Sequence, residues 1–254
     1  MTFLPPAPRA SHRWHGVLAL TLLLALGGCD GFGAIGNKQD YATKQAPLAY
    51  KSQGTATVLA FDERPYILSG SHNPDFVGLQ LNNYGIPFSV KTKSGRPFAA
   101  EMTDAFARSL ATGGIAARSI RLPGDEGDDH DENEADDDKD KNKDKDDEDS
   151  DTRITLAQAQ AMLLKGRPRR ALLVRVKQWE SSTYKYTTLE FDLTAIVYDA
   201  AGKALASKHI KGSDELGGKI LGAARKAREV SAAALPLKID EILNSPEIRA
   251  AFMS

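Results

Sequence analysis

Cysteine is almost absent from this chain, and long apolar segments are missing. Cys29 is the single cysteine among 254 residues, which excludes an intramolecular disulfide and a multi-cysteine metal site. No uncharged run reaches the roughly 20 residues that a transmembrane helix needs. Apolar residues make up 41% of the chain and charged residues 26%. This composition suits a globular body of one or two domains and excludes a polytopic membrane protein.

The net charge of -1 hides a strongly acidic segment at residues 124–151. The segment holds 17 of the 34 acidic residues and four of the 33 basic residues, so the rest of the chain carries 29 basic against 17 acidic residues. It contains no aromatic residue and no valine, isoleucine or leucine. Because such a composition cannot bury a core, we predict a disordered acidic insertion.

Three interpretations of the acidic insertion are open. It is a solvated loop, an electrostatic docking element for the basic body or for a partner, or a weak sink for Ca²⁺ or Mg²⁺. The run Asp136–Asp140 lacks the glycine and the glutamate of an EF-hand loop. We therefore predict no specific metal site in the insertion.

The amino-terminal residues have the pattern of a bacterial export signal. Residues 1–16 contain Arg9 and Arg13 and no acidic residue, and an uncharged core follows at 17–26. This core has the length of a signal-peptide core and is too short to cross a bilayer. It runs into Leu26–Cys29, which resembles the lipoprotein signal motif of an apolar residue, two small residues and cysteine.

The resemblance implies cleavage of a signal peptide at 1–28, attachment of diacylglycerol to the Cys29 thiol and acylation of the new amino terminus. A plain secretory signal with an incidental cysteine is the alternative. Two or three acyl chains anchor a protein stably, so we predict a lipoprotein of the bacterial cell envelope that faces the periplasm, with residues 29–50 as a lipidated tether. Asp30 resembles a signal for retention in the inner membrane. Export also removes the chain from nucleic acid, so no nucleic-acid partner is expected.

Two glycine-rich segments resemble nucleotide-binding motifs without their structural context. Residues 31–36 match the G-x-G-x-x-G pattern, but the anchor precedes them and a polar stretch follows, where the motif needs a strand and a helix. Residues 212–220 nearly match a P-loop, but the lysine comes one position late and no serine or threonine follows it. We therefore predict no nucleotide and no other cofactor.

Hydrophobic periodicity predicts the elements of the first half of the body. Strands are predicted at 55–62 and 115–122, and a helix at 98–112, after which two glycines stop it. The segment 63–97 carries proline and glycine too often for a long helix. Its apolar residues predict that it packs down on the body, with room for a short hairpin.

The second half continues with a helix, three strands and further helices. The helix is expected at 155–164, and the strands at 170–179, 187–198 and 203–210. A further helix is expected at 219–234, and Pro236 either kinks this helix or starts a new one. A last helix is expected from Ser245. In these strands apolar residues alternate with polar ones, so one face of the sheet is apolar and the other polar. This pattern indicates antiparallel strands with one solvated side. We predict an α+β fold, a single mixed or antiparallel sheet with helices packed on one face, whose parts at 51–123 and 152–254 form one domain around the insertion.

Three segments of the second half carry a family resemblance: 172–177, 197–203 and 212–217. With the element order, they resemble envelope lipoproteins of the YajG type, which in turn resemble auxiliary lipoproteins of ABC transport systems. The resemblance implies a fold similar to the amino-terminal domain of TolB and supplies no catalytic residues. The segment 63–97 and the acidic insertion depart from the family pattern.

No catalytic or metal-ligating set stands out in the sequence. The histidines His72, His130 and His209 are far apart and none has the spacing of a two-histidine metal site, and no nucleophile-elbow motif is present. Three aromatic residues are interpreted as strand-end packing rather than as a ligand box: Trp179, Tyr184 and Tyr186. We predict no catalytic residue and no bound metal.

Two basic clusters admit two interpretations. The first comprises Lys165, Arg167, Arg169 and Arg170, and the second comprises Lys219, Arg225, Lys226 and Arg228. Attraction to anionic lipid headgroups is one interpretation. A solvated turn and a solvated helix face are the other.

These features favour a non-enzymatic adaptor or assembly partner for another envelope protein. Tethering raises its effective concentration at the membrane, and an exposed sheet edge or a cleft would bind the partner. One alternative is a binding module in which the segment 63–97 covers a lipid or a small envelope molecule. The other alternative is an unrecognised hydrolase.

Overall fold

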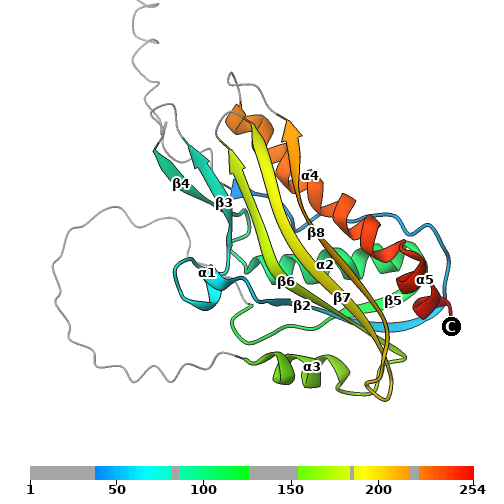
Figure 1. The fold of residues 1–254 in the computed structure, drawn as a ribbon. Helices are drawn as coiled ribbons and strands as arrows, with labels where there is room; N and C mark the ends of the chain where they lie inside the picture. The colour runs from blue at the N-terminus through cyan, green and yellow to red at the C-terminus, as the bar shows by residue number, and fades with distance from the viewer. Residues whose placement is uncertain (1–37, 82–85, 126–153, 184–185, 218–222) are drawn as a thin grey trace, which may run out of the picture. The chain divides into compact units, whose positions relative to one another are not determined.

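The computed structural model of the chain describes residues 38–81, 86–125, 154–183, 186–217 and 223–254, the side chains of 223–229 excepted. These residues form an eight-stranded sheet and five helices (Figure 1). In chain order the elements are β1 (Lys38–Gln39), β2 (Gly54–Asp62), α1 (Pro65–Leu68), β3 (Phe76–Leu81), β4 (Pro87–Thr92), α2 (Phe98–Thr112), β5 (Ile115–Ser119), α3 (Leu156–Leu164), β6 (Arg170–Thr183), β7 (Thr187–Asp199), β8 (Ala204–Gly217), α4 (Ala223–Leu243) and α5 (Pro246–Met253).

The sheet is mixed and is built around β6. Strand β2 runs parallel to the first half of β6, with Ala56 level with Arg170, and β3 runs parallel to its second half, with Gly78 level with Ser181. Strand β7 pairs antiparallel along the other edge of β6, and β8 pairs antiparallel with β7. Strand β5 lies beyond β2, while β4 and then β1 lie beyond β3. The predicted α+β fold with a mixed sheet is confirmed.

Alternate residues of the central strands face two separate hydrophobic clusters. In β2, Val58 and Ala60 belong to the larger cluster, whereas Leu59 and Phe61 belong to the smaller one. Helices α2, α4 and α5 contribute to the larger cluster and cover one face, as the sequence predicts. Helix α3 is the exception, because its Leu163 packs in the smaller cluster on the other face.

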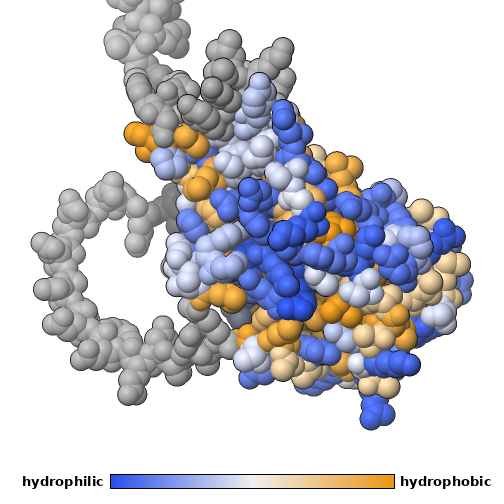
Figure 2. Space-filling view, viewed as in Figure 1, coloured by the Kyte–Doolittle hydropathy of each residue, from blue (hydrophilic) through white to orange (hydrophobic). Residues whose placement is uncertain are grey.

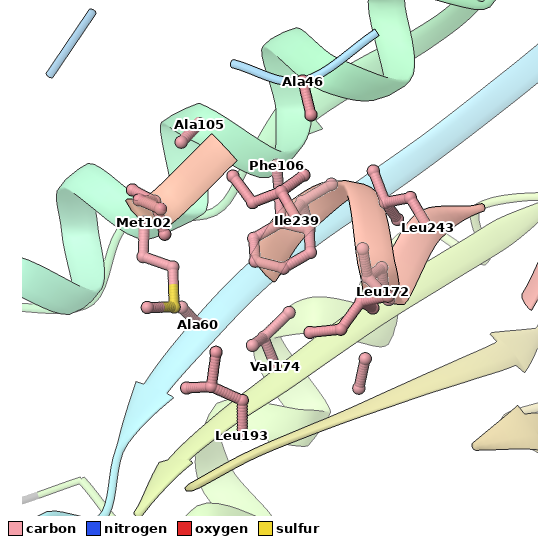
Figure 3. Packing of buried hydrophobic residues seen from close by; sticks show 14 of the residues in the cluster. Ala46, Ala60, Met102, Ala105, Phe106, Leu172, Val174, Leu193, Ile239 and Leu243 are labelled. Carbon is pink, nitrogen blue, oxygen red and sulfur yellow. The ribbon is translucent and has the colours of Figure 1, made fainter. Parts of the chain in front are cut away.

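The larger cluster is packed from two helices and the centre of the sheet. In Figure 3, Met102 and Phe106 of α2 and Ile239 of α4 point toward Val174 of β6 and Leu193 of β7. All five side chains are 0% exposed. Because burial of a side chain of this size contributes about 1.5–3 kcal/mol, this cluster is a main source of stability.

Helix α2 begins and ends at the residues that the periodicity predicts. Phe98, Met102, Phe106 and Leu110 recur every four residues, and each is fully buried. Such spacing places all four on one face of a helix. Gly114 follows with φ 91°, a left-handed conformation that favours glycine after a helix.

The segment 63–97 packs against the sheet and contains the expected hairpin. Strands β3 and β4 pair antiparallel, with Leu81 level with Pro87. The short helix α1 precedes them and begins with a proline, whose fixed φ suits the first helical position.

Four other elements differ from their predictions. Strand β6 continues to Thr183, beyond the expected 179. Strand β5 ends at Ser119, before the expected 122. Strand β8 continues to Gly217 because its pairing with β7 extends as far as Thr187. Helix α4 is continuous with Pro236 inside it, so no new helix starts there.

Residues 38–50 pack on the body, so the prediction of a free tether up to residue 50 is wrong for this part. Tyr41 is 0% exposed, and its ring meets the ring of Phe98 edge to face, with centroids 4.9 Å apart. Ala46 donates its backbone N–H to Ser109 Oγ at 2.9 Å. The sequence pattern missed this because isolated apolar residues between polar ones show neither helix nor strand periodicity.

Three predicted features lie outside the described residues: the signal peptide at 1–28, Cys29 and the acidic insertion from residue 126 onward. Cleavage, lipidation and disorder of the insertion therefore stay predictions. In the part of the chain that the structure describes, none of the helices has the length and apolar character to cross a bilayer.

Candidate functional site

Strand β8 is a long, exposed edge of the sheet. It has 14 residues, of which Ile210 is the only buried one. Among the described strands, β7 alone pairs with β8, so one side of β8 has no neighbouring strand (Figure 1). An edge of this kind presents a row of backbone N–H and C=O groups with which another extended chain can pair.

Two helices hold β8 in place from the side of the larger cluster. Lys238 Nζ of α4 lies 2.8 Å from Asp214 Oδ2 of β8 and 3.9 Å from the centroid of the Phe191 ring of β7. Lys208 Nζ of β8 lies 3.3 Å from Glu247 Oε1 of α5. These ion pairs join β8 to both helices, so the open edge has a defined position.

On the opposite face of the sheet, Asp192 of β7 binds two basic side chains of β8. Its Oδ1 is 2.9 Å from His209 Nε2, and its Oδ2 is 3.4 Å from Lys211 Nζ. Burial raises the pKa of Asp192, but the hydrogen bonds from His209 and Lys211 outweigh burial and hold the pKa below its ordinary value. Asp192 is therefore a counter-ion that orders the basic part of β8.

Charge is divided along β8. Lys208, His209 and Lys211 lie in its middle, whereas Asp214 and Glu215 lie toward its end. Lysine on an edge strand opposes indiscriminate pairing with other strands. The edge therefore suits a partner strand that places acidic side chains opposite the lysines.

A second polar group is buried beside β2. Arg64 is 0% exposed, and its Nε and Nη2 donate to the two carboxylate oxygens of Asp62 at 2.8 and 2.7 Å. Its Nη1 donates to the carbonyl oxygen of Phe76 at 2.6 Å, and its Nη2 donates to that of Pro74 at 3.2 Å. The carboxylate and the carbonyl groups satisfy the guanidinium inside the protein. Arg64 thus ties the segment after β2 to its surroundings.

The aromatic residues expected at strand ends have different surroundings. Trp179 lies inside β6, is 0% exposed and stacks on Phe98 with ring centroids 5.3 Å apart. Its Nε1 donates to the hydroxyl of Tyr41 at 3.3 Å. Tyr186 lies just before β7 and is 56% exposed. Tyr184 lies outside the described residues.

Glu101 is a buried acid in the first turn of α2. It is 0% exposed; one carboxylate oxygen accepts a hydrogen bond from Ser94 Oγ, and the other has no partner among the described residues. Burial raises the pKa of Glu101 to about 7, against the opposing hydrogen bond from Ser94 and the charge of Arg96. The backbone N–H of Tyr41 also opposes this rise in the pKa of Glu101, so Glu101 lies near the packed amino-terminal segment.

Part of the first basic cluster has a structural role. Arg170 Nε donates to the carbonyl oxygen of Ala251 at 2.7 Å, at the end of α5. Arg169 Nη1 donates to the carbonyl oxygen of Gln53 at 3.2 Å. These two arginines join β6 to the carboxyl-terminal helix and to the start of β2. The side chains of the second basic cluster lie outside the described part.

The histidines do not come together. The ring of His72 stacks on Phe76 with centroids 3.9 Å apart, whereas His209 faces Asp192 on β7. His130 lies outside the described residues. Within residues 38–81, 86–125, 154–183, 186–217 and 223–254, no group of three or more His, Cys, Asp or Glu side chains could hold a metal ion.

Sequence reasoning did not single out Arg64, Glu101 or Asp192. An acidic residue at the end of an apolar strand and a basic residue two positions later, as at Asp62 and Arg64, are a weak indication of a buried ion pair. The grouping of Asp192 with His209 depends on the register of β7 and β8, which periodicity does not determine.

The described residues thus define an α+β protein with a curled mixed sheet and one long open edge. No protein-family model matches the chain, and no curated protein matches it. Similar solved structures include a Xanthomonas campestris protein of family DUF330, with 11% identity, a TM-score of 0.42, and coverage of 78% of this chain and 90% of that chain.

Two further similar structures are PelC from Paraburkholderia phytofirmans, described as a dodecamer, and the lipoprotein GNA1162 from Neisseria meningitidis. PelC is 13% identical with a TM-score of 0.38 and covers 80% of this chain and 93% of its own. GNA1162 is 12% identical with a TM-score of 0.25 and covers 74% and 98%. The neighbours are bacterial proteins, and one is a lipoprotein, but likeness at this level assigns neither a family nor a function.

Proposed function

We propose that this chain is a lipid-anchored lipoprotein of the bacterial envelope that acts, without catalysis, as an adaptor for another envelope protein. The open edge of β8 is the docking site, and the partner contributes an extended segment to the sheet. The lipoprotein signal motif at Leu26–Cys29 supports the anchoring. The sequence also resembles envelope lipoproteins of the YajG type, which in turn resemble auxiliary lipoproteins of ABC transport systems, and this resemblance is part of the proposal.

The observation that carries the proposal is the 14-residue edge strand. A strand of this length without a neighbour risks aggregation unless charge or a partner covers it. Here two helices fix the strand and Asp192 orders its basic side chains, so the edge is preorganised. Preorganisation reduces the entropy that is lost on binding and thereby strengthens an interface.

The buried polar groups support a binding role more than a catalytic one. The guanidinium of Arg64 bonds to Asp62 and to backbone carbonyls, and Asp192 bonds to His209 and Lys211. These contacts serve the protein's own structure. The ligand-binding alternative, in which the segment 63–97 covers a ligand, has less support. The hydrogen bonds of Arg64 to Phe76 and Pro74 hold part of this segment in place.

Site-specific photo-cross-linking in cells tests the docking edge. Benzoylphenylalanine placed at Lys211 or Ser213 on β8 is compared with the same residue at Arg118, which is exposed on the short edge strand β5. We expect one discrete adduct with another envelope protein from the two β8 positions and none from Arg118. Equal adducts from both edges, or none from β8, contradict the proposal. An adduct between two copies of this chain makes the edge a self-assembly surface and contradicts the adaptor role.

The anchor has an independent test. Mass spectrometry of the mature protein should find residues 1–28 removed and acyl chains on Cys29. Cys29→Ser should move the protein from the membrane fraction to the soluble fraction. A mature chain that keeps residues 1–28 and a bare thiol would show that the anchoring part of the proposal is wrong.

A further inference from the structure

The strand register brings three chain segments to one end of the sheet. Leu81, the last residue of β3, follows Gln80, which is level with Thr183 at the end of β6. Thr187, the first residue of β7, is level with both Thr183 and Gly217, the last residue of β8. The ends of β3 and β6, the start of β7 and the end of β8 therefore lie together, and we call this the hairpin end.

The hairpin end exposes large apolar side chains. Ile86, just before β4, is 59% exposed, and Tyr186, just before β7, is 56% exposed. Leu81 and Phe88 are partly exposed on the same hairpin. Figure 2 shows hydrophobic side chains gathered at the outer end of β3 and β4. Tyrosine is enriched in the interfacial layer of a bilayer, where its hydroxyl stays in the headgroup region, and an exposed isoleucine gains free energy when it is buried among acyl chains.

The amino-terminal end of β1 is directed toward the same end of the sheet. Strand β1 runs parallel to β4, with Lys38 level with Lys91, so its amino-terminal end is directed along β4 toward Pro87 at the hairpin end. Nine residue steps separate Lys38 from Cys29. At about 3.5 Å per residue, the connection reaches at most about 32 Å.

We infer that the hairpin end, with Ile86 and Tyr186, is the surface that docks on the bilayer carrying the acyl chains. This inference rests on the proposed lipid anchor at Cys29. The anchor confines the body so closely to the bilayer that weak insertion of two side chains determines its orientation. Strand β8 then extends away from the bilayer from its end at Gly217, since the 13 residue steps back to Ala204, at about 3.3 Å each, span about 43 Å.

Acidic residues limit how deeply the hairpin end enters the bilayer. Glu215 of β8 is exposed and level with Thr188, one residue from this end of β7. Glu180 and Glu190 lie directly opposite each other on β6 and β7, three residues from the end of their pairing at Thr183 and Thr187. One to three residues of strand correspond to about 3 to 10 Å. Because carboxylates are costly in hydrocarbon, the docking is shallow and involves side chains at the strand ends, such as Ile86 and Tyr186.

A single-site fluorescent label tests the orientation. The lipid occupies Cys29, the only native cysteine, so an introduced cysteine on the full, lipidated chain takes the environment-sensitive NBD group alone. The positions are Ile86→Cys and Tyr186→Cys, with Leu205→Cys as the matched control. Leu205 is 40% exposed and lies at the start of β8, the opposite end of that strand.

The chains are reconstituted into phosphatidylcholine vesicles that contain lipids with a nitroxide near the headgroup. We expect blue-shifted emission at positions 86 and 186 and a nitroxide-dependent loss of about half or more of their intensity, because interfacial insertion places the label among the lipids. The label at position 205 should show neither change. Thermal unfolding of each labelled chain verifies that it is folded.

The outcomes separate the orientation from the anchor. If the vesicles carry the protein in flotation but position 205 is quenched, or positions 86 and 186 are not, the inferred orientation is wrong and the anchor stands. A blue shift at 86 without quenching means that protein, such as a second copy, covers this end, which also overturns the inference. If the chain does not float and mass spectrometry finds Cys29 bare, the proposed function itself fails, and the orientation fails with it.

Discussion

Glu101 keeps a carboxyl group in the interior, where one of its oxygens lacks a hydrogen-bond partner among the described residues. Burial raises the pKa of Glu101 from 4.5 to about 7. The unfolded chain therefore releases this proton at lower pH than the folded protein does. The contribution of Glu101 to stability is complete below about pH 4.5 and is lost as the pH rises through 7.

Glu101→Gln should remove this pH dependence. The variant keeps a neutral side chain at every pH, so its stability relative to the natural protein should rise between pH 5 and pH 8, by up to about 3 kcal/mol. Urea unfolding at the two pH values measures the change. Glu215→Gln, on exposed β8, is the control for the loss of a negative charge. If the difference in the free energy of unfolding between Glu101→Gln and the natural protein is the same at both pH values, the raised pKa of Glu101 is wrong.

Gly78 shows how closely two strands approach. A Cβ at this position would lie 2.0 Å from the carbonyl oxygen of Ser181 on β6. We expect Gly78→Ala to reduce the free energy of unfolding by more than about 2 kcal/mol, because β3 has to move away from β6. Gly95→Ala is the control, since Gly95 also has a positive φ but nothing within 4 Å of its Cβ position. Equal losses in chemical denaturation would mean that backbone conformation, and not the close approach, sets the cost.

Arg64 offers a test of the buried ion pair. Lysine keeps the charge of Arg64 but cannot form the paired bonds to Asp62 and also reach the carbonyl of Phe76. We expect Arg64→Lys to cost about 2–4 kcal/mol in urea unfolding. Arg175→Lys, whose partner Glu63 lies in a partly exposed ion pair, should cost under about 1 kcal/mol. Similar costs for both would show that burial adds nothing to the Arg64 pair.

At the scale of elements, strong periodicity and clear stop signals made predictions accurate. The range of α2 follows from its buried face and the glycines after it, and β2 follows from an unbroken run of strand-forming residues. Strand β8 was predicted too short because its last residues are polar and exposed, and pairing with β7 extends it. The site could not be predicted from periodicity, since Asp192 meets His209 only through strand register.

Helix α4 tolerates a proline in its interior. Pro236 removes one helical hydrogen bond and clashes with the preceding turn, which costs about 3 kcal/mol in an ordinary helix. We expect Pro236→Ala to raise the free energy of unfolding by about 1–3 kcal/mol. Chemical denaturation provides the measurement, and Ala233→Pro, at an exposed position of the same helix, should have the opposite sign. An unchanged or lower stability in Pro236→Ala would mean that the local bend is needed for packing on the sheet.

At the scale of the molecule, the body begins earlier than composition indicates. Tyr41 and Trp179 are both fully buried and hydrogen-bonded to each other, although 138 positions separate them in the chain. No local pattern reveals a contact over that distance. The predicted tether ended at residue 50 for this reason, whereas the folded body already includes Lys38.

A truncation series measures how much this segment stabilises the body. An anchorless chain that starts at Gly36 keeps Tyr41 and Tyr50, whereas one that starts at Lys51 exposes the rings of Phe98 and Trp179. We expect the shorter chain to lose more than about 3 kcal/mol, or to fail to fold, because it loses two buried aromatic residues. Urea unfolding of both chains provides the comparison. Equal stability would mean that residues 36–50 are dispensable for the fold.

The packing of residues 38–50 also bears on how the protein could be shed. A protease that cut within this stretch would have to pull Tyr41 out of the core before its cleft could reach the backbone. With the proposed acylation of Cys29, release of an intact body would depend on a cut before Lys38, among the eight residues that follow the cysteine. With that anchor, so short a linker would leave little room for an enzyme between the bilayer and the folded chain, and the membrane-bound form would be long-lived.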